Sequence, residues 1–140
     1  MRKYLIFSIA LISLVGCGGS PSLVGKWNMA GGTLPEGSKI VTEFAEKTYK
    51  MNVEIAQMGT TIKFAVNGDY TFDGKRIKMM GKSIDLDEAS LPAALKPSAG
   101  LMKEGMEKKM LETQEGEAKL EGDTLTMMDK GKPATFTRMK

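Results

Sequence analysis

The side chains that usually carry out enzymatic chemistry are sparse in this 140-residue chain. It contains no histidine, which is the commonest general base and the commonest metal ligand. Ser38, Ser83, Ser90 and Ser98 therefore have no imidazole to activate them, and the sequence has neither a Gly-x-Ser-x-Gly elbow nor a phosphate-binding loop. We expect a protein that is not an enzyme and that binds no cofactor.

Methionine is the unusual residue of the composition, with 12 copies. Met102, Met106 and Met110 are spaced so that they share one face of a helix, and their soft thioethers suit Cu(I). Methionine also fills irregular hydrophobic cores, and we favour this interpretation over a metal site. Asp85 and Asp87 are interpreted as a solvated strand end rather than as a catalytic or calcium-binding pair.

The single cysteine, Cys17, has the surroundings of a lipid-attachment site. It ends the segment Leu14-Val15-Gly16-Cys17, which resembles the lipobox that bacterial lipoprotein signal peptidase reads. Arg2 and Lys3 followed by an apolar run over residues 4–15 form the matching export pattern. At about 1.5 Å per residue the run covers roughly 18 Å, short of the roughly 30 Å hydrocarbon core of a membrane. We expect a cleaved signal peptide over 1–16, a lipidated Cys17 and a flexible tether over 18–22.

The charge balance indicates which partners to expect. Without Arg2 and Lys3, the mature part has 18 basic and 17 acidic residues, so neither nucleic-acid binding nor a polybasic membrane surface is predicted. Acyl chains on Cys17 would attach the protein to a membrane, since each buried methylene contributes about 0.8 kcal/mol. Gly18, where an aspartate would favour the inner membrane, favours the periplasmic face of the outer membrane in a host with two membranes.

Apolar residues alternate with polar ones from Ile40 onward, which predicts antiparallel strands. If Glu46-Lys47 is a two-residue turn, Phe44 lies opposite Tyr49 and Ile40 lies opposite Val53. Both strands then turn the same face inward. The segment 57–60 is interpreted as the next connection.

An internal repeat predicts two equivalent hairpins farther along. Residues 68–80 align without gaps to residues 116–128, with matching glycine, acidic and apolar positions. In the first copy, Asp73-Gly74 predicts a tight turn that sets Tyr70 opposite Ile77. The second copy would turn four side chains inward: Ala118, Leu120, Leu125 and Met127.

The segment 87–113 has Pro92 and Pro97 and few β-branched residues, so it predicts a helical insertion. Ser98 is expected to cap the helix. Gly105 weakens such a helix by about 1 kcal/mol relative to alanine, so tertiary packing must hold it. We expect the helix to cover one opening of the sheet, although its end from about Lys108 could instead continue as a strand.

Gly25 and Trp27 form a Gly-x-Trp motif at the start of residues 23–140, and Arg138 has inward parity in a last strand over 134–138. With these residues the chain resembles the lipocalin-like domains of small bacterial lipoproteins, although it has no disulfide and its helical segment interrupts the strands. The resemblance implies an up-and-down barrel whose closed end is formed by Trp27 packed against Arg138. The fold expected is mainly β, a small antiparallel barrel or half-barrel built from hairpins, with a sandwich as the alternative.

Two functions are compatible with this fold. The barrel would bind a small apolar molecule in a cavity, or its core would be filled and its outer face or methionine-bearing helix would dock on another envelope protein. The side chains expected to line the cavity are Trp27, Phe44, Tyr49, Met51, Val53, Phe64, Tyr70 and Phe72.

Overall fold

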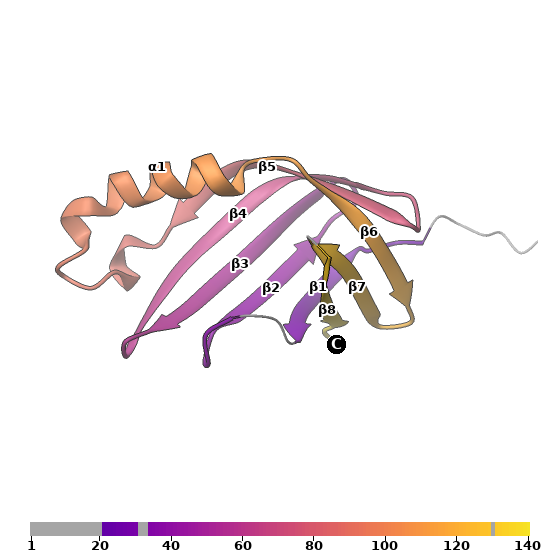
Figure 1. Cartoon of the computed structure of the whole chain (residues 1–140), viewed down its shortest axis with the longest axis horizontal. Coiled ribbons are helices and arrows are strands. Elements are labelled where there is room, and N and C mark those ends of the chain that lie inside the picture. The colour runs from indigo at the N-terminus through magenta and orange to yellow at the C-terminus, as the bar shows by residue number, and fades with distance from the viewer. Residues whose placement is uncertain (1–20, 31–33, 130) are drawn as a thin grey trace, which may run out of the picture.

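Eight antiparallel strands form a closed barrel in the computed structural model, which describes residues 21–30, 34–129 and 131–140 (Figure 1). Each strand pairs with the next along the chain, and the first pairs with the last. The predicted up-and-down barrel is therefore confirmed in its closed form, and the half-barrel and the sandwich are not adopted. The strands are β1 (Gly25–Ala30), β2 (Lys39–Phe44), β3 (Thr48–Gln57), β4 (Thr60–Phe72), β5 (Arg76–Leu86), β6 (Gln114–Glu121), β7 (Thr124–Asp129) and β8 (Lys132–Arg138).

The hairpin of β2 and β3 has the predicted register. Phe44 lies opposite Tyr49, and Ile40 lies opposite Val53. The backbone N–H of Ala45 donates to the carbonyl of Thr48 at 2.8 Å, which encloses Glu46 and Lys47 as a two-residue turn. The next connection also lies where expected, because Met58 and Gly59, both with positive φ, separate β3 from β4.

The predicted pairing of Tyr70 with Ile77 is wrong by two residues. In the hairpin of β4 and β5, Tyr70 lies opposite Met79, and Phe72 lies opposite Ile77. Because successive side chains of a strand point to opposite faces, a shift of two leaves every side chain on its expected face. The inward set of this hairpin is therefore as predicted, although its partners are not.

The side chain of Asp73 accounts for the shifted turn. Its Oδ1 accepts the backbone N–H groups of Lys75 and Arg76 at 2.8 and 2.7 Å. Asp73 therefore ends the strand, and the two-residue turn is Gly74-Lys75, with Gly74 at φ +94°. Glycine with positive φ at the first central position is the pattern of a type II′ turn.

The two copies of the repeat fold into equivalent hairpins, as predicted. In the hairpin of β6 and β7, Leu120 lies opposite Leu125, which is the register of Phe72 and Ile77 moved by one repeat. Gly122, the counterpart of Gly74, also has positive φ. Ala118 and Leu125 are buried, and Leu120 and Met127 pack against the same core.

The insertion between β5 and β6 is helical, as predicted. It contains two short 3₁₀ turns, η1 (Glu88–Ser90) and η2 (Lys96–Ser98), and the helix α1 (Ala99–Met110). β6 begins only at Gln114, so the helix does not continue as a strand from Lys108. Ser98 occupies the N-cap position, but its side chain makes no capping hydrogen bond. Because η2 runs directly into α1, Ser98 has ψ near 6° rather than the extended geometry of a capping residue.

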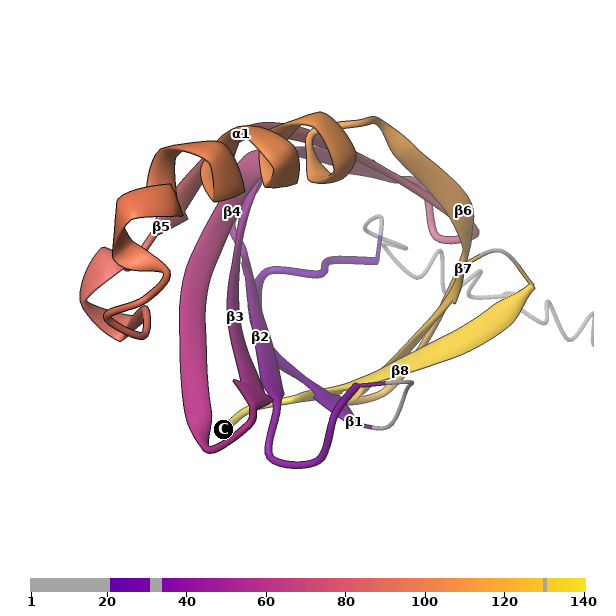
Figure 2. The same cartoon turned by 60° about the vertical axis from the view of Figure 1, so that its left-hand side comes forward.

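Helix α1 lies along the half of β5 that β6 leaves unpaired (Figures 1 and 2). β5 pairs with β6 only over Arg76–Met79, and beyond that Leu111 comes close to Gly81. Met106, Met110 and Leu111 pack against the barrel core. The insertion therefore covers the core where these two strands part. In the described residues, no helix is both long and apolar enough to cross a membrane.

Candidate ligand-binding groove

The side chains predicted to line a cavity share one packed cluster inside the barrel. Phe44, Val53 and Phe64 are at most 7% exposed, and the ring of Phe44 packs edge-on against that of Tyr70, with centroids 4.7 Å apart. Tyr49 and Tyr70 are buried, and Met51 and Phe72 are half-buried. None of the five main depressions on the described residues is lined by Phe44, Met51, Val53 or Phe64. These side chains belong to the core cluster or pack against it, whereas Tyr49, Tyr70 and Phe72 also line depressions.

Trp27 and Arg138 meet across the seam that closes the barrel. They lie opposite each other in β1 and β8, and the guanidinium carbon of Arg138 is 4.3 Å from the centroid of the Trp27 ring. Trp27 is fully buried, and its Nε1 donates to the carbonyl of Leu23 at 2.8 Å. A cation over an indole face is attractive, because the face carries the negative end of the ring quadrupole.

The segment Pro21–Val24, here called the mouth segment, lies across the barrel end at which β1 begins (Figure 2). Arg138 holds it there, because Nη1 donates to the carbonyl of Val24 at 2.6 Å and Nη2 to that of Ser22 at 3.4 Å. Leu23 is 1% exposed and belongs to the core. Pro21 and Ser22, which we predicted to belong to the tether, thus lie against the barrel.

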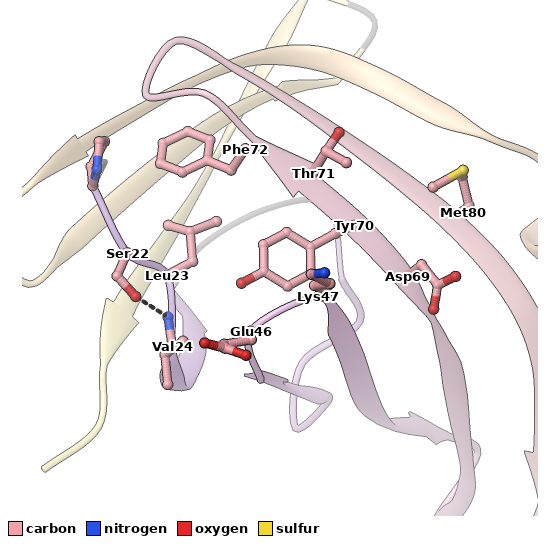
Figure 3. Close-up of a pocket in the computed structure, with 11 residues that line it drawn as sticks. Ser22, Leu23, Val24, Glu46, Lys47, Asp69, Tyr70, Thr71, Phe72 and Met80 are labelled. Carbon is pink, nitrogen blue, oxygen red and sulfur yellow. Dashed lines mark hydrogen bonds between the residues drawn. The ribbon is translucent and has the colours of Figure 1, made fainter. Parts of the chain in front are cut away.

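A groove of about 830 Å³, here called the mouth groove, opens between the mouth segment and β4 (Figure 3). Leu23, Tyr70 and Phe72 form its apolar side, where alternate residues of β4 face the mouth segment. Glu46 and Lys47, from the turn between β2 and β3, lie at its rim. Its volume is within the range of small-molecule sites, and its lining is mainly apolar with a few polar groups, as is usual for them.

Two other depressions have a larger share of charged residues in their lining than the mouth groove. One of about 550 Å³ lies beside Gly68 and is lined by Glu43, Lys50, Asp69 and Lys82 among others. Another of about 730 Å³ lies over β5, β6 and β7 and is bordered mainly by charged side chains. Exposed charged walls of both signs favour solvent rather than a small apolar molecule. The mouth groove is therefore the best candidate for the predicted apolar ligand.

The two tyrosines of the core cluster both have a raised pKa. Burial raises the pKa of Tyr70, and the carboxylate of Glu46 adds to the rise. Burial also raises the pKa of Tyr49, with a smaller contribution from Asp69. The hydroxyl of Tyr70 donates to the carbonyl of Ala45 at 2.6 Å, which fixes the ring on the groove wall. Tyr70 therefore offers an apolar ring face rather than a free hydroxyl.

The three methionines proposed as the weaker Cu(I) alternative lie on α1. Met106 and Met110 pack against the barrel core, and Met102 is half-buried. Packing of Met106 and Met110 against apolar neighbours is compatible with the core-filling interpretation. Within the described residues, no group of three or more His, Cys, Asp or Glu side chains is placed to hold a metal ion.

Sequence reasoning missed the residues that shape the mouth groove from outside the strands. The sequence predicts only a tether for Pro21 and only a turn for Glu46 and Lys47, and it gives Val24 no role. The apolar pair Leu23-Val24 directly before Gly25 is the one signal that the chain here joins the core. Cys17 and the predicted signal peptide lie outside the described residues.

Comparison with known proteins supplies neither a family nor a function for this chain. No protein-family model and no curated protein matches the chain. The crystal structure of an uncharacterized protein from Bacteroides eggerthii DSM 20697 aligns with 84% of this chain and 100% of that chain, at 11% identity and a TM-score of 0.49. The assignment of the fold rests on the strand topology described above.

Proposed function

We propose that this protein is a non-catalytic lipoprotein of the bacterial cell envelope that holds a small hydrophobic molecule in the mouth groove of a lipocalin-like barrel. The observation that carries the binding role is the groove itself, a depression of about 830 Å³ walled by Leu23, Tyr70 and Phe72. The lipobox ending at Cys17 supports the envelope location, and Gly18 supports the outer membrane in a host with two membranes.

Two measurements test this proposal. Cells fed radiolabelled palmitate should label the protein through Cys17, and Cys17→Ser should abolish the label. Native mass spectrometry of the purified protein should then show a bound species of fixed mass that is lost in Phe72→Glu. An unlabelled protein would contradict the anchor, and a bare protein mass from every preparation would contradict the ligand.

A second function is favoured by the packed core cluster and by exposed apolar residues on and near α1. Leu101 is 75% exposed on that helix, and Leu95, 38% exposed, lies just before η2. Such a surface would dock on another envelope protein rather than enclose a ligand. Cross-linking in intact cells from position 95 distinguishes the two functions, because a docking surface gives one defined adduct that Leu101→Glu removes.

A further inference from the structure

We propose that the mouth groove faces the membrane and holds an acyl chain of a phospholipid from that membrane. This inference rests on the proposed anchoring through Cys17. It concerns where the groove lies and which hydrophobic molecule it takes, and neither follows from the lipobox or from the barrel fold alone.

The first argument is the length of the chain before the groove. Only Gly18, Gly19 and Ser20 separate Cys17 from Pro21, which itself lines the groove. At 3.3–3.6 Å per extended residue, the four steps from Cys17 to Pro21 reach at most about 14 Å. Acyl chains on Cys17 lie in the hydrocarbon layer, so the barrel end that carries the groove is held close to the bilayer surface.

The second argument is that this end of the barrel cannot swing freely away from the tether. Arg138 in β8 binds the carbonyls of Val24 and Ser22, and Trp27 in β1 binds that of Leu23. The end of the predicted tether and the residues directly after it are thus fixed to both strands that close the barrel. Acidic and basic side chains are equal in number on the turns and at the C-terminus of this barrel end: Glu46, Asp73 and Asp123 against Lys47, Lys75 and Lys140. The tether rather than electrostatic attraction to the membrane therefore determines the orientation.

The third argument is the chemistry of the walls. Leu23, Tyr70 and Phe72 line one side, and Val24, which is 46% exposed, continues the apolar surface outward toward the tether. The hydroxyl of Tyr70 is already bonded to Ala45, so it has little to offer a polar ligand. Lys47 at the rim can meet a phosphate beside the membrane surface, while its long stem stays on apolar surface. A single acyl chain with a phosphate head fits apolar walls inside the groove and a lysine at its rim.

Trp27 allows a direct test because it is the only tryptophan of the chain and bonds to Leu23 beneath the groove. The full lipidated protein is placed in phosphatidylcholine vesicles whose lipids carry bromine atoms on the acyl chains. Bromine quenches tryptophan only at short range. We expect lower Trp27 fluorescence than in unbrominated vesicles, and loss of most of this quenching in Phe72→Glu and in Val24→Glu.

Met128→Glu is the matched control, because Met128 is 40% exposed and lies on the other large depression. It should leave the quenching unchanged. Val24→Glu guards against misfolding of Phe72→Glu, since Val24 is exposed and its backbone carbonyl is kept. Absence of quenching, or quenching equal in both groove variants and the control, overturns the inference. If palmitate labels Cys17 and a bound mass persists while quenching is absent, the proposed function stands and only the membrane-facing groove is wrong.

Discussion

Arg138 connects parts of the chain that lie far apart in sequence. Its guanidinium stacks on Trp27, donates to two carbonyls of the mouth segment, and lies 3.5 Å through Nε from a carboxylate oxygen of Asp123. A planar fork of donors can serve several acceptors while one face covers an aromatic ring, which the point charge of lysine cannot do. Arg138 therefore connects the mouth segment to β1, to β8 and to the turn after β6.

Arg138→Met should lower the free energy of unfolding by about 2 kcal/mol, because a charge-assisted hydrogen bond and the cation over Trp27 are lost together. Urea unfolding followed by Trp27 fluorescence measures this, and Arg138→Lys should recover only part of the loss. Arg76→Met is the control, since Arg76 is exposed and pairs only with Glu115 at 3.4 Å. The control should change stability by less than about 0.5 kcal/mol. Equal losses in both variants would contradict the role of Arg138.

Tyr70→Phe should cost about 1 kcal/mol at pH 7, because the carbonyl of Ala45 loses its donor. The folded state raises the pKa of Tyr70 above its usual 10.0, so at alkaline pH the unfolded chain releases this proton first. Stability from this residue is complete below pH 10 and falls as the pH rises toward the folded pKa. The stability difference between wild type and Tyr70→Phe should therefore shrink above pH 10. Urea titrations at neutral and alkaline pH measure it, and a constant or growing difference would argue against a buried phenol.

At the level of strands and turns, the sequence predicts which side of the sheet a residue faces better than it predicts which residue lies opposite it on the neighbouring strand. The register of β2 and β3 was predicted to the residue, because alternation on both sides of Glu46-Lys47 allows only one pairing that buries both apolar sets. The turn after β4 was misplaced because Asp-Gly is the commoner turn signal, while here the Asp73 carboxylate binds the two N–H groups that follow Gly74. The alternation of apolar and polar residues does not reveal that a side chain will accept hydrogen bonds from backbone N–H groups.

The mouth groove was beyond sequence reasoning for a different reason. Its walls come from β4, from the turn after β2 and from the segment before β1, which are joined only when β8 pairs with β1. Phe72 and Tyr70 were predicted as inward residues, but their position at the end of the barrel depends on where the mouth segment lies. That position is set by hydrogen bonds from Arg138, more than a hundred residues away.

Both copies of the hairpin repeat have a glycine, Gly68 or Gly116, at a position where the backbone of the next strand leaves no room for a side chain. A Cβ on Gly68 would collide with the carbonyl of Met80 and lie 2.8 Å from Cε1 of Tyr49, and the equivalent Gly116 would meet the carbonyl of Met128. Gly68→Ala should cost at least about 2 kcal/mol, because backbone must shift to admit the methyl group. Gly105→Ala on α1 is the matched control.

A Cβ on Gly105 meets nothing within 4 Å, so alanine there should raise stability by about 0.5–1 kcal/mol through higher helix propensity. Thermal unfolding monitored by far-UV circular dichroism compares the two variants directly. Opposite signs are expected for the same chemical change. A neutral Gly68→Ala would mean that the β4–β5 hairpin is looser than its close backbone approach indicates.

The barrel as a whole is closed by seams of unequal length. β3 pairs with β4 along its full span, Thr48–Gln57, whereas β5 meets β6 only over Arg76–Met79. Beyond that point helix α1 takes the place of a strand, and it contributes side-chain packing without a backbone ladder. A closed barrel has no free edge, but separation breaks few hydrogen bonds at its short seams, which have four paired positions each: β5 with β6, β1 with β2, β1 with β8 and β6 with β7.

Amide hydrogen exchange should therefore reveal a hierarchy of opening. Amides of β3 and β4 should exchange only through global unfolding, with a free energy that falls steeply as denaturant is added. Amides of the β5–β6 seam should exchange through a smaller opening whose free energy hardly responds to dilute denaturant, because separating a short seam and lifting α1 exposes little surface. Weakening the seam with Ile77→Ala should accelerate its exchange more than that of β3, since Ile77 is buried at the seam opposite Gly116. One exchange free energy shared by all the strands would instead show that the barrel opens only as a unit.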